Sequence, residues 1–351
     1  MFSVVSNFPN YYDDLIYFVY EKHRQRKEDY QTKLKIRQKF YDILNNQLDN
    51  VQFDLYMVGS TQTQFSLRSS DMDLCMLVYD NDGHIDQRYR HDKTMAIKLL
   101  KSIKDILMKK FHLTNEINLL MNARVPILKI ETEWNFYRLA VDLNLNGDLS
   151  IRNTFLLTFY QELDDRVAPL VIAIKSWARK NCIDSPFYGM LSSYSLSLMA
   201  IHFLQNIQPP ILPLMQIELS SGSSTDDQQQ QFDHIVDSGR LQENLDIFLL
   251  ETRKKFHCQN HWSLGELFYR FIEYYQQRFD YHQTFSVRKL FDNRLSSSIT
   301  GSSFIVIEDP FHYHNTASSV TLSSFITIMN VFNHTYSSLK CFTLSEQFFD
   351  F

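Results

Sequence analysis

The sequence predicts an α+β fold in which a small mixed sheet is inserted into a mainly helical chain. β-type runs and one amphipathic helix alternate between about residues 50 and 150, and long helical patterns fill most of the remainder. A chain of 351 residues also exceeds what one hydrophobic core usually holds. We therefore expect a sheet domain over 50–150 and a helical domain made of 1–49 and 151–351.

The individual elements follow from the spacing of apolar residues, which repeats every two positions in strands and every 3.6 in helices. Polar clusters separate them. In chain order, the predicted elements are one or two helices over 10–49, β-type runs over 53–78, an amphipathic helix over 87–111, strands at 123–132 and 137–146 joined by a turn at 134–136, helices from 153 to about 283, and a solvated loop at 220–231.

Composition excludes several classes of protein. The chain carries 35 Lys and Arg against 40 Asp and Glu, so it lacks the positive charge of a tight, non-specific nucleic-acid binder. Its four cysteines show no paired spacing, which argues against a disulfide framework or a structural zinc site. Neither a signal peptide nor a bilayer-spanning apolar run is visible. We expect a protein of the cytoplasm, or secondarily of the nucleus, with no membrane partner.

Three acidic residues form the sharpest chemical pattern. Asp71 and Asp73 are two positions apart in a β-type run, so their side chains project from the same face. Asp142 lies in an alternating segment that can pair beside this run. Convergent carboxylates repel one another unless a cation lies between them, and oxygen ligands favour Mg²⁺ or Mn²⁺. Two such ions can activate an attacking hydroxyl and stabilise a leaving pyrophosphate.

Gly59 and Ser60 come shortly before the acidic pair. A tight turn without a side chain at position 59 lets backbone N–H groups approach a phosphate. A Gly-Ser pair or an Asp-x-Asp pair alone is more often an ordinary turn. It is the joint order of these motifs, followed by Asp142 in a second β segment, that indicates nucleotide chemistry.

Seven stretches between about 55 and 320 carry a resemblance to a known family. They are VGSTQTQFSLRSSDMDLCMLV (58–78), ARVPILKI (123–130), VDLNLNGDLSIRNTFLL (141–157), IAIKSWARKNCID (172–184), MLSSYSLSLMAIHFLQ (190–205), SLGELFYRFIEYY (263–275) and IEDPFHYHNTASSV (307–320). In this order they resemble the DNA polymerase β-like nucleotidyltransferases, specifically the group of cytoplasmic poly(A) RNA polymerases of the germline-development type and terminal uridylyltransferases.

The resemblance implies a polymerase β-like palm beside a mainly helical central domain, with the active site in the cleft between them. It also implies a segment typical of poly(A) polymerases at about 262–320 and a base-recognition loop at 307–317. By resemblance, Asp71 and Asp73 bind two metal ions, and Asp142 completes the site that activates the RNA 3′-hydroxyl.

The resemblance also assigns residues that would contact the nucleotide. Cations would offset charge on the pyrophosphate, and an aromatic ring would stack on the base without reading its identity. The implied residues are Gly59 and Ser60 at the triphosphate, Asn153 at the ribose with Thr154 beside it, Lys175, Arg179 and Ser193 at the phosphates, Tyr194 under the base, and Glu308, Asp309, His314 and Asn315 around the base edge.

The resemblance gives conflicting indications about which nucleotide base the protein selects. His314 directly before Asn315, together with Asp309, resembles the uridylyltransferases. The short spacing from Phe311 to Asn315 resembles the poly(A) polymerases instead. Because a polar contact discriminates between bases only if its geometry is right, we expect ATP as the substrate, with UTP as the alternative.

One position departs from the family pattern. Relatives usually carry glycine where this chain has Gln64, and glutamine adopts a left-handed backbone less readily. We therefore expect a rearranged loop after Ser60.

Two other patterns have ordinary explanations that compete with functional ones. The basic stretches 22–39 and 88–110 are candidates for an RNA track, although most such runs are solvated helix faces. His257, Cys258 and His261 suggest a zinc site, but no fourth ligand is evident, and a plain helix start is favoured.

Together, these inferences predict template-independent addition of AMP to RNA 3′ ends, with mRNA rather than DNA as the substrate. No RNA-recognition motif, KH or zinc-knuckle signature is visible, so we expect an RNA-binding protein to supply target choice. The alternatives are a terminal uridylyltransferase, a small-molecule nucleotidyltransferase or oligoadenylate synthase, and a catalytically inactive scaffold that binds RNA or protein.

Overall fold

The computed structural model describes residues 10–111, 117–122, 125–134, 137–214, 241–287, 303–312 and 314–349. Internal contacts divide the chain into two compact units. The first, called the sheet unit, comprises Gln25–Thr158 and Gln229–Leu245. The second, called the helical unit, comprises Met1–Arg24, Phe159–Gln228 and Asp246–Phe351.

The sheet unit is built on five strands in the order β1-β2-β5-β4-β3. Neighbouring strands are antiparallel except β2 and β5, which run parallel. A parallel pair needs a long crossover connection, which the chain between β2 and β5 provides. The strands are β1 (Gln52–Val58), β2 (Met72–Tyr79), β3 (Ile117–Leu120), β4 (Ile127–Trp134) and β5 (Tyr137–Leu145).

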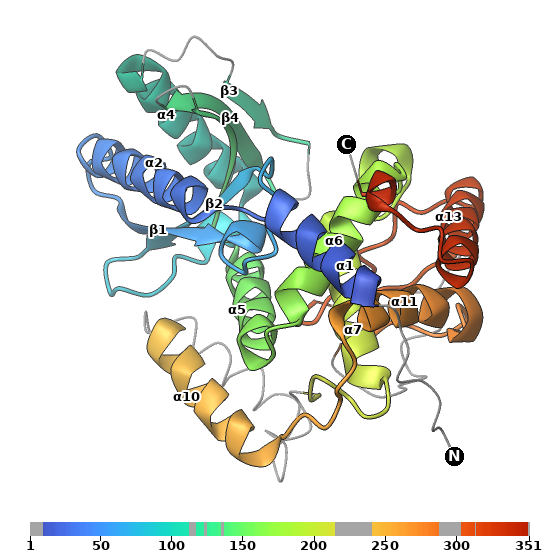
Figure 1. Cartoon of the computed structure of the whole chain (residues 1–351). Coiled ribbons are helices and arrows are strands. Elements are labelled where there is room, and N and C mark those ends of the chain that lie inside the picture. The colour runs from blue at the N-terminus through green and yellow to red at the C-terminus, as the bar shows by residue number, and fades with distance from the viewer. Residues whose placement is uncertain are drawn as a thin grey trace. The chain divides into compact units, whose positions relative to one another are not determined.

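Helices α2 (Lys27–Asn45) and α4 (Lys93–Phe111) lie side by side and cover one face of this sheet (Figure 1). Apolar residues of both helices share one core with alternate residues of the strands, including Leu74 of β2 and Leu143 of β5. Burying each such side chain contributes about 1.5–3 kcal/mol. Smaller elements of the unit are η1 (Gly59–Thr61), α3 (Arg88–His91) and the first part of α5 (Asp148–Leu163).

The opposite face of β2 carries the other set of alternating residues. Cys75 and Leu77 pack there with Val58 and with Ile151 of α5. Asp73 belongs to the same alternating set, because it is two positions before Cys75. The acidic pattern thus lies on the sheet face that α2 and α4 do not cover.

The helical unit has a core rich in aromatic rings. Trp177 packs edge to face against Phe268 and Phe332, and its ring nitrogen donates to Thr335 Oγ1 at 2.9 Å. Its elements are α1 (Asn10–His23), the end of α5, α6 (Val167–Lys180), η2 (Pro186–Tyr188), α7 (Ser193–Asn206), α10 (Leu241–Lys255) from Asp246 on, α11 (Leu264–Glu273), a π-helical turn at Tyr274–Arg278, α13 (Leu322–Lys340) and η5 (Glu346–Phe348).

Local sequence signals set the starts of several of these helices. Ser192, Ser263 and Thr321 are N-caps whose hydroxyls accept backbone N–H groups of α7, α11 and α13. Gly265 allows α11 to approach α1 closely, since a Cβ at that position would lie 2.6 Å from the backbone of Tyr12.

The structure confirms most predicted elements and shifts one. The region 10–49 contains two helices, and β4 and β5 form the predicted antiparallel hairpin. The strand predicted at 123–132 starts only at Ile127, and β3 precedes it. Pro126 lacks the N–H that a ladder needs, which explains the late start. The predicted loop at 220–231 lies outside the described residues.

The division into units differs from the predicted boundary on the N-terminal side. The sequence analysis grouped all of 1–49 with the helical domain, whereas α2 belongs to the sheet unit. The physical reason is the apolar face of α2, where Ile36, Phe40 and Leu44 are fully buried in the core beneath the sheet. Across the described ranges, the structure contains no helix with the length and apolarity to cross a membrane.

Candidate active site

Neighbouring strands place four residues in one row across the sheet. Val58 of β1 is opposite Asp73 of β2, Asp73 is beside Asp142 of β5, and Asp142 is opposite Lys129 of β4. Cross-strand partners present their side chains on the same face. Two of the three predicted acids are therefore side by side, and Asp71 lies just before β2.

The charges of these acids are coupled. The pKa of Asp73 is raised to about 7, mainly by desolvation and then by the negative charges of Asp142 and Asp71. The pKa of Asp71 is also raised, first by desolvation and then by the charge of Asp142. A site that disfavours its own carboxylate charges in this way is suited to a cation. The donor set fits Mg²⁺ or Mn²⁺, which prefer carboxylate oxygens.

Lys129, which the sequence analysis did not single out, already neutralises the third acid. Its Nζ contacts Oδ1 of Asp142 at 3.0 Å and Oδ2 at 2.9 Å. Burial lowers the pKa of Lys129, but the hydrogen bond and charge of Asp142 outweigh it and leave the pKa raised. Within the described part of the chain, no three His, Cys, Asp or Glu side chains are grouped closely enough to hold a metal ion as they stand.

A second lysine missed by the sequence analysis supports the site from α2. Lys33 is fully buried, and its Nζ donates to Thr61 Oγ1 and to the carbonyl of Ser70, each at 3.1 Å. Burial lowers its pKa to about 8, against the opposing charges of acids that include Asp73 and Asp71. Lys33 thus ties the turn after β1 to the start of β2.

Gly59 has the conformation and the surroundings that only glycine satisfies. Its φ is +69°, and a Cβ there would lie 2.6 Å from Oδ2 of Asp73. Its N–H donates to Thr154 Oγ1 at 2.8 Å, and that hydroxyl donates to the carbonyl of Ser150. Thr154, which was predicted beside the ribose, therefore stabilises the Gly59–Ser60 turn through this hydrogen bond. Asn153 is the neighbouring half-buried residue on α5.

Gln64 does adopt the backbone that usually requires glycine. Its φ is +59°, in the left-handed region, and its side chain is exposed. Glutamine thus takes up this conformation here, although it does so less readily than glycine. The cost of a left-handed non-glycine residue is about 1–2 kcal/mol, which the surrounding turn has to offset.

The helical unit holds the other predicted residues. Lys175 on α6 is buried, so the competing interpretation as a surface lysine was wrong. Arg179 follows one turn later and pairs with Asp184 at 3.2 Å. Ser193 is the first residue of α7, and Tyr194 next to it donates its hydroxyl to Oδ2 of Asp309 at 3.1 Å.

The predicted base-recognition loop is held by its own buried polar groups. Asp309 is 1% exposed, and its Oδ1 accepts from the backbone N–H groups of Phe311 and His312. The Nδ1 atoms of His312 and His314 are 3.2 Å apart. Glu308 is buried as well. Asp309 therefore orients both the loop and the ring of Tyr194.

Asn315 has a structural role in this loop. Its Oδ1 accepts from the N–H groups of Ile307 and Ala317, and its Nδ2 donates to the carbonyl of Ile305. The prediction placed this amide at the base edge, yet the structure uses both of its ends to hold the backbone. Asn315 thus fixes the backbone of the predicted base-recognition loop.

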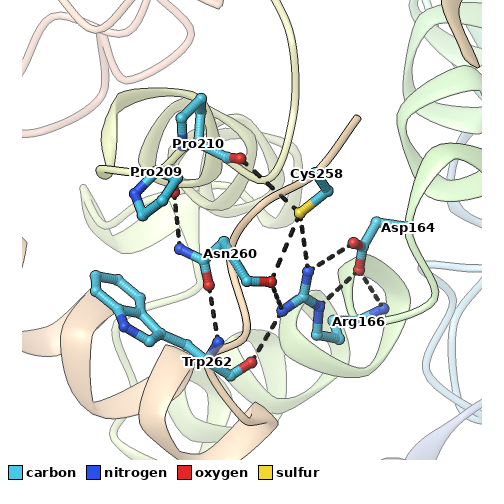
Figure 2. A network of polar contacts seen from close by, with 7 residues as sticks. All are labelled: Asp164, Arg166, Pro209, Pro210, Cys258, Asn260 and Trp262. Atoms are coloured by element: carbon cyan, nitrogen blue, oxygen red, sulfur yellow. Dashed lines mark hydrogen bonds and ion pairs between the residues drawn. The ribbon is translucent and has the colours of Figure 1, made fainter. Parts of the chain in front are cut away.

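The structure gives Cys258 an alternative to zinc ligation. The sulfur of Cys258 lies 3.2 Å from the guanidinium of Arg166, which also pairs with Asp164 and donates to the carbonyls of Asn260 and Trp262 (Figure 2). This network fastens the segment before α11 to the turn before α6. The network gives Cys258 a role in the fold.

The predicted site residues thus fall into two groups. Those in the sheet unit are Gly59, Ser60, Asp71, Asp73, Asp142, Asn153 and Thr154, and those in the helical unit are Lys175, Arg179, Ser193, Tyr194, Asp309, His314 and Asn315. The first group supplies carboxylates and a phosphate turn, and the second supplies cations, an aromatic ring and a polar loop.

Comparisons with known proteins identify relatives of this chain. Residues 13–162 match the family model described as "Poly(A) RNA polymerase, mitochondrial-like, central palm domain". The chain is 35% identical over 268 residues to Poly(A) RNA polymerase GLD2 of Mus musculus, and 34% identical over 268 residues to that of Homo sapiens. Each match covers 76% of this chain and 51% of the relative, so the chain spans about half the length of these proteins.

Solved structures give the same result for the fold. A cytoplasmic RNA terminal U-transferase superposes with a TM-score of 0.72 at 25% identity, covering 95% of this chain and 94% of that chain. The Cid1 poly(U) polymerase bound to Mg and 3′-dATP superposes with a TM-score of 0.73 at 25% identity, covering 94% of each chain. The chain therefore belongs to the DNA polymerase β-like nucleotidyltransferases, in the group that contains the GLD2-type poly(A) RNA polymerases and the terminal uridylyltransferases.

Proposed function

We propose that this chain is an RNA 3′-terminal nucleotidyltransferase that adds AMP from ATP without a template and releases pyrophosphate. The observation that carries the proposal is the register that puts Asp73 beside Asp142, with Asp71 next to them and the pKa values of Asp71 and Asp73 raised. Such a cluster is costly for a fold to keep without a cationic partner. The GLD2 relatives support RNA as the acceptor.

Asp71, Asp73 and Asp142 are the residues that would hold two divalent ions, Mg²⁺ or Mn²⁺. When bound, such ions lower the pKa of an RNA 3′-hydroxyl and neutralise the leaving pyrophosphate. The protein's own part is to fix the carboxylates on adjacent strands. The Gly59–Ser60 turn, held by Thr154, lies against Asp73 and would receive the triphosphate.

On the nucleotide side, Tyr194 would stack on the base. Its hydroxyl is fixed by Asp309, so its ring is oriented before the nucleotide arrives. This preorganisation spares the entropy of ordering the ring on binding. Lys175 and Arg179, one turn apart on α6, would supply positive charge to the phosphates.

ATP is favoured as the substrate by the short recognition loop and by the names of the GLD2 relatives. His314 supports the second candidate, a terminal uridylyltransferase. Two of the similar structures come from work on the UTP selectivity of the Cid1 poly(U) polymerase, and one of them is a histidine-to-asparagine variant bound to MgATP. A histidine of that protein was therefore substituted in a study of its base choice.

We further propose that the acceptor is the 3′ end of mRNA in the cytoplasm and that an RNA-binding protein supplies target choice. The support is the absence of a recognisable RNA-binding motif and the net charge of −5. Binding of unrelated RNAs with equal, weak affinity by the isolated chain would agree with this. Strong discrimination among unrelated 3′ ends by the chain alone would contradict it.

The test is extension of a short labelled RNA with each of the four nucleotides and Mg²⁺. We expect a ladder with ATP that is lost in Asp142→Asn, a variant that keeps the side-chain volume. Failure of the folded wild-type chain to extend RNA with any nucleotide would overturn the proposal. A preference for UTP that His314→Thr reverses would overturn ATP in favour of the second candidate.

A further inference from the structure

We propose that Lys129 is a built-in counter-cation that holds Asp142 in the metal-free protein and competes with divalent ions for it. This inference rests on the proposed function, because it concerns the same carboxylates. It assigns Lys129 as a positioning residue that has to release Asp142 before that acid can join Asp73 and Asp71.

The sheet register creates this competition. Lys129 and Asp142 are direct partners of β4 and β5, while Asp73 is the partner of Asp142 on the other side. Asp142 therefore lies between an ammonium group and a second carboxylate on the same face. Both of its oxygens contact Lys129 Nζ, at 3.0 and 2.9 Å. A divalent ion would need those same oxygens.

The two lysines near the acids differ in whether they can leave. Lys33 is fully buried, and Thr61 and Ser70 accept its hydrogen bonds, so its charge stays in place. The side chain of Lys129 is 44% exposed, and its four-carbon stem can carry the ammonium group into solvent. Only the second lysine can therefore give way to an ion at little cost.

The charge balance explains why a temporary cation is useful here. Asp71, Asp73 and Asp142 all act on one another, and Glu131 on the same strand as Lys129 adds a further negative charge at Asp71. Without Lys129, Lys33 would be the one remaining cation of the described residues that acts on Asp71 and Asp73. Lys129 thus stabilises the metal-free protein, and in doing so it weakens the apparent affinity of the three acids for metal.

The experiment measures Mn²⁺ binding to the whole chain from the electron paramagnetic resonance signal of free Mn²⁺, without nucleotide or RNA. Lys129→Met removes the charge and keeps the length of the side chain. We expect it to bind Mn²⁺ about two- to fivefold more tightly, the range expected for loss of one partly exposed ion pair. Lys129→Arg keeps the pair and should bind like the wild type. Lys104→Met removes one positive charge from α4 and serves as the matched control.

A second readout is the melting temperature without metal. We expect it to fall in Lys129→Met and to recover when Mn²⁺ is added. Lys129→Gln provides an independent neutral variant should the methionine variant fold poorly. Equal or weaker Mn²⁺ binding by a folded neutral variant would overturn the inference.

The design separates this inference from the proposed function. Asp73→Asn identifies the ions bound at the acidic cluster. If the wild-type chain binds no Mn²⁺ that Asp73→Asn removes, the metal site of the proposed function fails, and this inference fails with it. If that binding is present but its affinity is the same in the wild type and the neutral Lys129 variants, only the present inference fails.

Discussion

The two groups of site residues are held in place by different means. In the sheet unit, Asp73, Asp142 and Lys129 take their positions from strand register, which a one-residue slip would destroy altogether. In the helical unit, Tyr194 and the loop around Asp309 depend on side-chain hydrogen bonds. The difference teaches that the positions of Asp73 and Asp142 are rigidly specified, whereas the predicted base-recognition loop can change with few substitutions.

Among substitutions in the sheet group, Asp73→Asn is expected to have the largest effect. We expect RNA extension to fall at least about a thousandfold, because one carboxylate of the metal cluster is lost. The free energy of unfolding of the metal-free protein should rise at the same time. The raised pKa of Asp73 means that its charge opposes folding as pH increases above the unfolded value, and asparagine removes that charge.

Extension rates and urea titrations at pH 7.5 or above measure both effects of Asp73→Asn. A fall in stability together with the fall in rate would indicate a structural role instead.

Gly59→Ala tests the turn against which Asp73 rests. The new Cβ would meet Oδ2 of Asp73 at 2.6 Å, and the φ of +69° is strained for alanine. We expect a loss of about tenfold to a hundredfold in kcat/KM for the nucleotide and about 1–3 kcal/mol in unfolding free energy. Steady-state kinetics and denaturant titration provide the measurements.

Gly83→Ala is the matched control for Gly59→Ala, because Gly83 has φ +81° with nothing within 4 Å of its Cβ position. It should share the backbone strain but keep the activity. Equal kinetic losses in the two variants would argue against the contact with Asp73 as the cause.

Asn315→Ala tests the helical group, because it removes the hydrogen bonds that hold the predicted base-recognition loop. Three backbone partners lose their hydrogen bonds, so we expect unfolding free energy to fall by about 2–4 kcal/mol. The nucleotide KM should rise while the ratio of ATP to UTP use drifts towards one, because the loop loses its shape. Asn330→Ala, at an exposed site on α13, is the control that should change neither quantity.

Gln64→Gly is expected to have the smallest effect, and a favourable one. Relief of the left-handed backbone should raise unfolding free energy by about 0.5–1 kcal/mol, after the extra freedom of glycine in the unfolded chain is subtracted. Asn50→Gly, at φ +62°, should gain less because asparagine tolerates this region better. A urea titration that ranks Asn50→Gly above Gln64→Gly would contradict the strain argument.

Alternation along the strands made much of the sheet group predictable. The position of Asp142 in a second alternating run was sufficient to predict that it lies on the same face as Asp73. The same reasoning could have found Lys129, which alternates with the buried Leu128 and Ile130 and so shares the face of Asp142. The alternation along this strand therefore predicts the position of Lys129 from the sequence alone.

Tertiary hydrogen bonds explain what the sequence could not predict. Thr154 and Asn315 were expected to contact the nucleotide. In the structure, Thr154 accepts a hydrogen bond from the backbone of Gly59, which is distant in sequence, and Asn315 accepts one from Ile307 across its loop. Nothing in the local pattern distinguishes these uses of a hydroxyl or an amide. Lys33 was predictable in part. Its spacing to Ile36 and Phe40 places it on the buried face of α2, but its hydrogen-bond partners come from other segments.

The parallel pairing of β2 with β5 has a consequence for how this protein becomes active during folding. Asp73 and Asp142 are neighbours across directly paired strands, although α4, β3 and β4 lie between those strands in the sequence. Contacts of such long sequence separation tend to form late, after local hairpins such as β4–β5. A folding chain would therefore pass through a stage with compact secondary structure in which Asp73 and Asp142 are still apart.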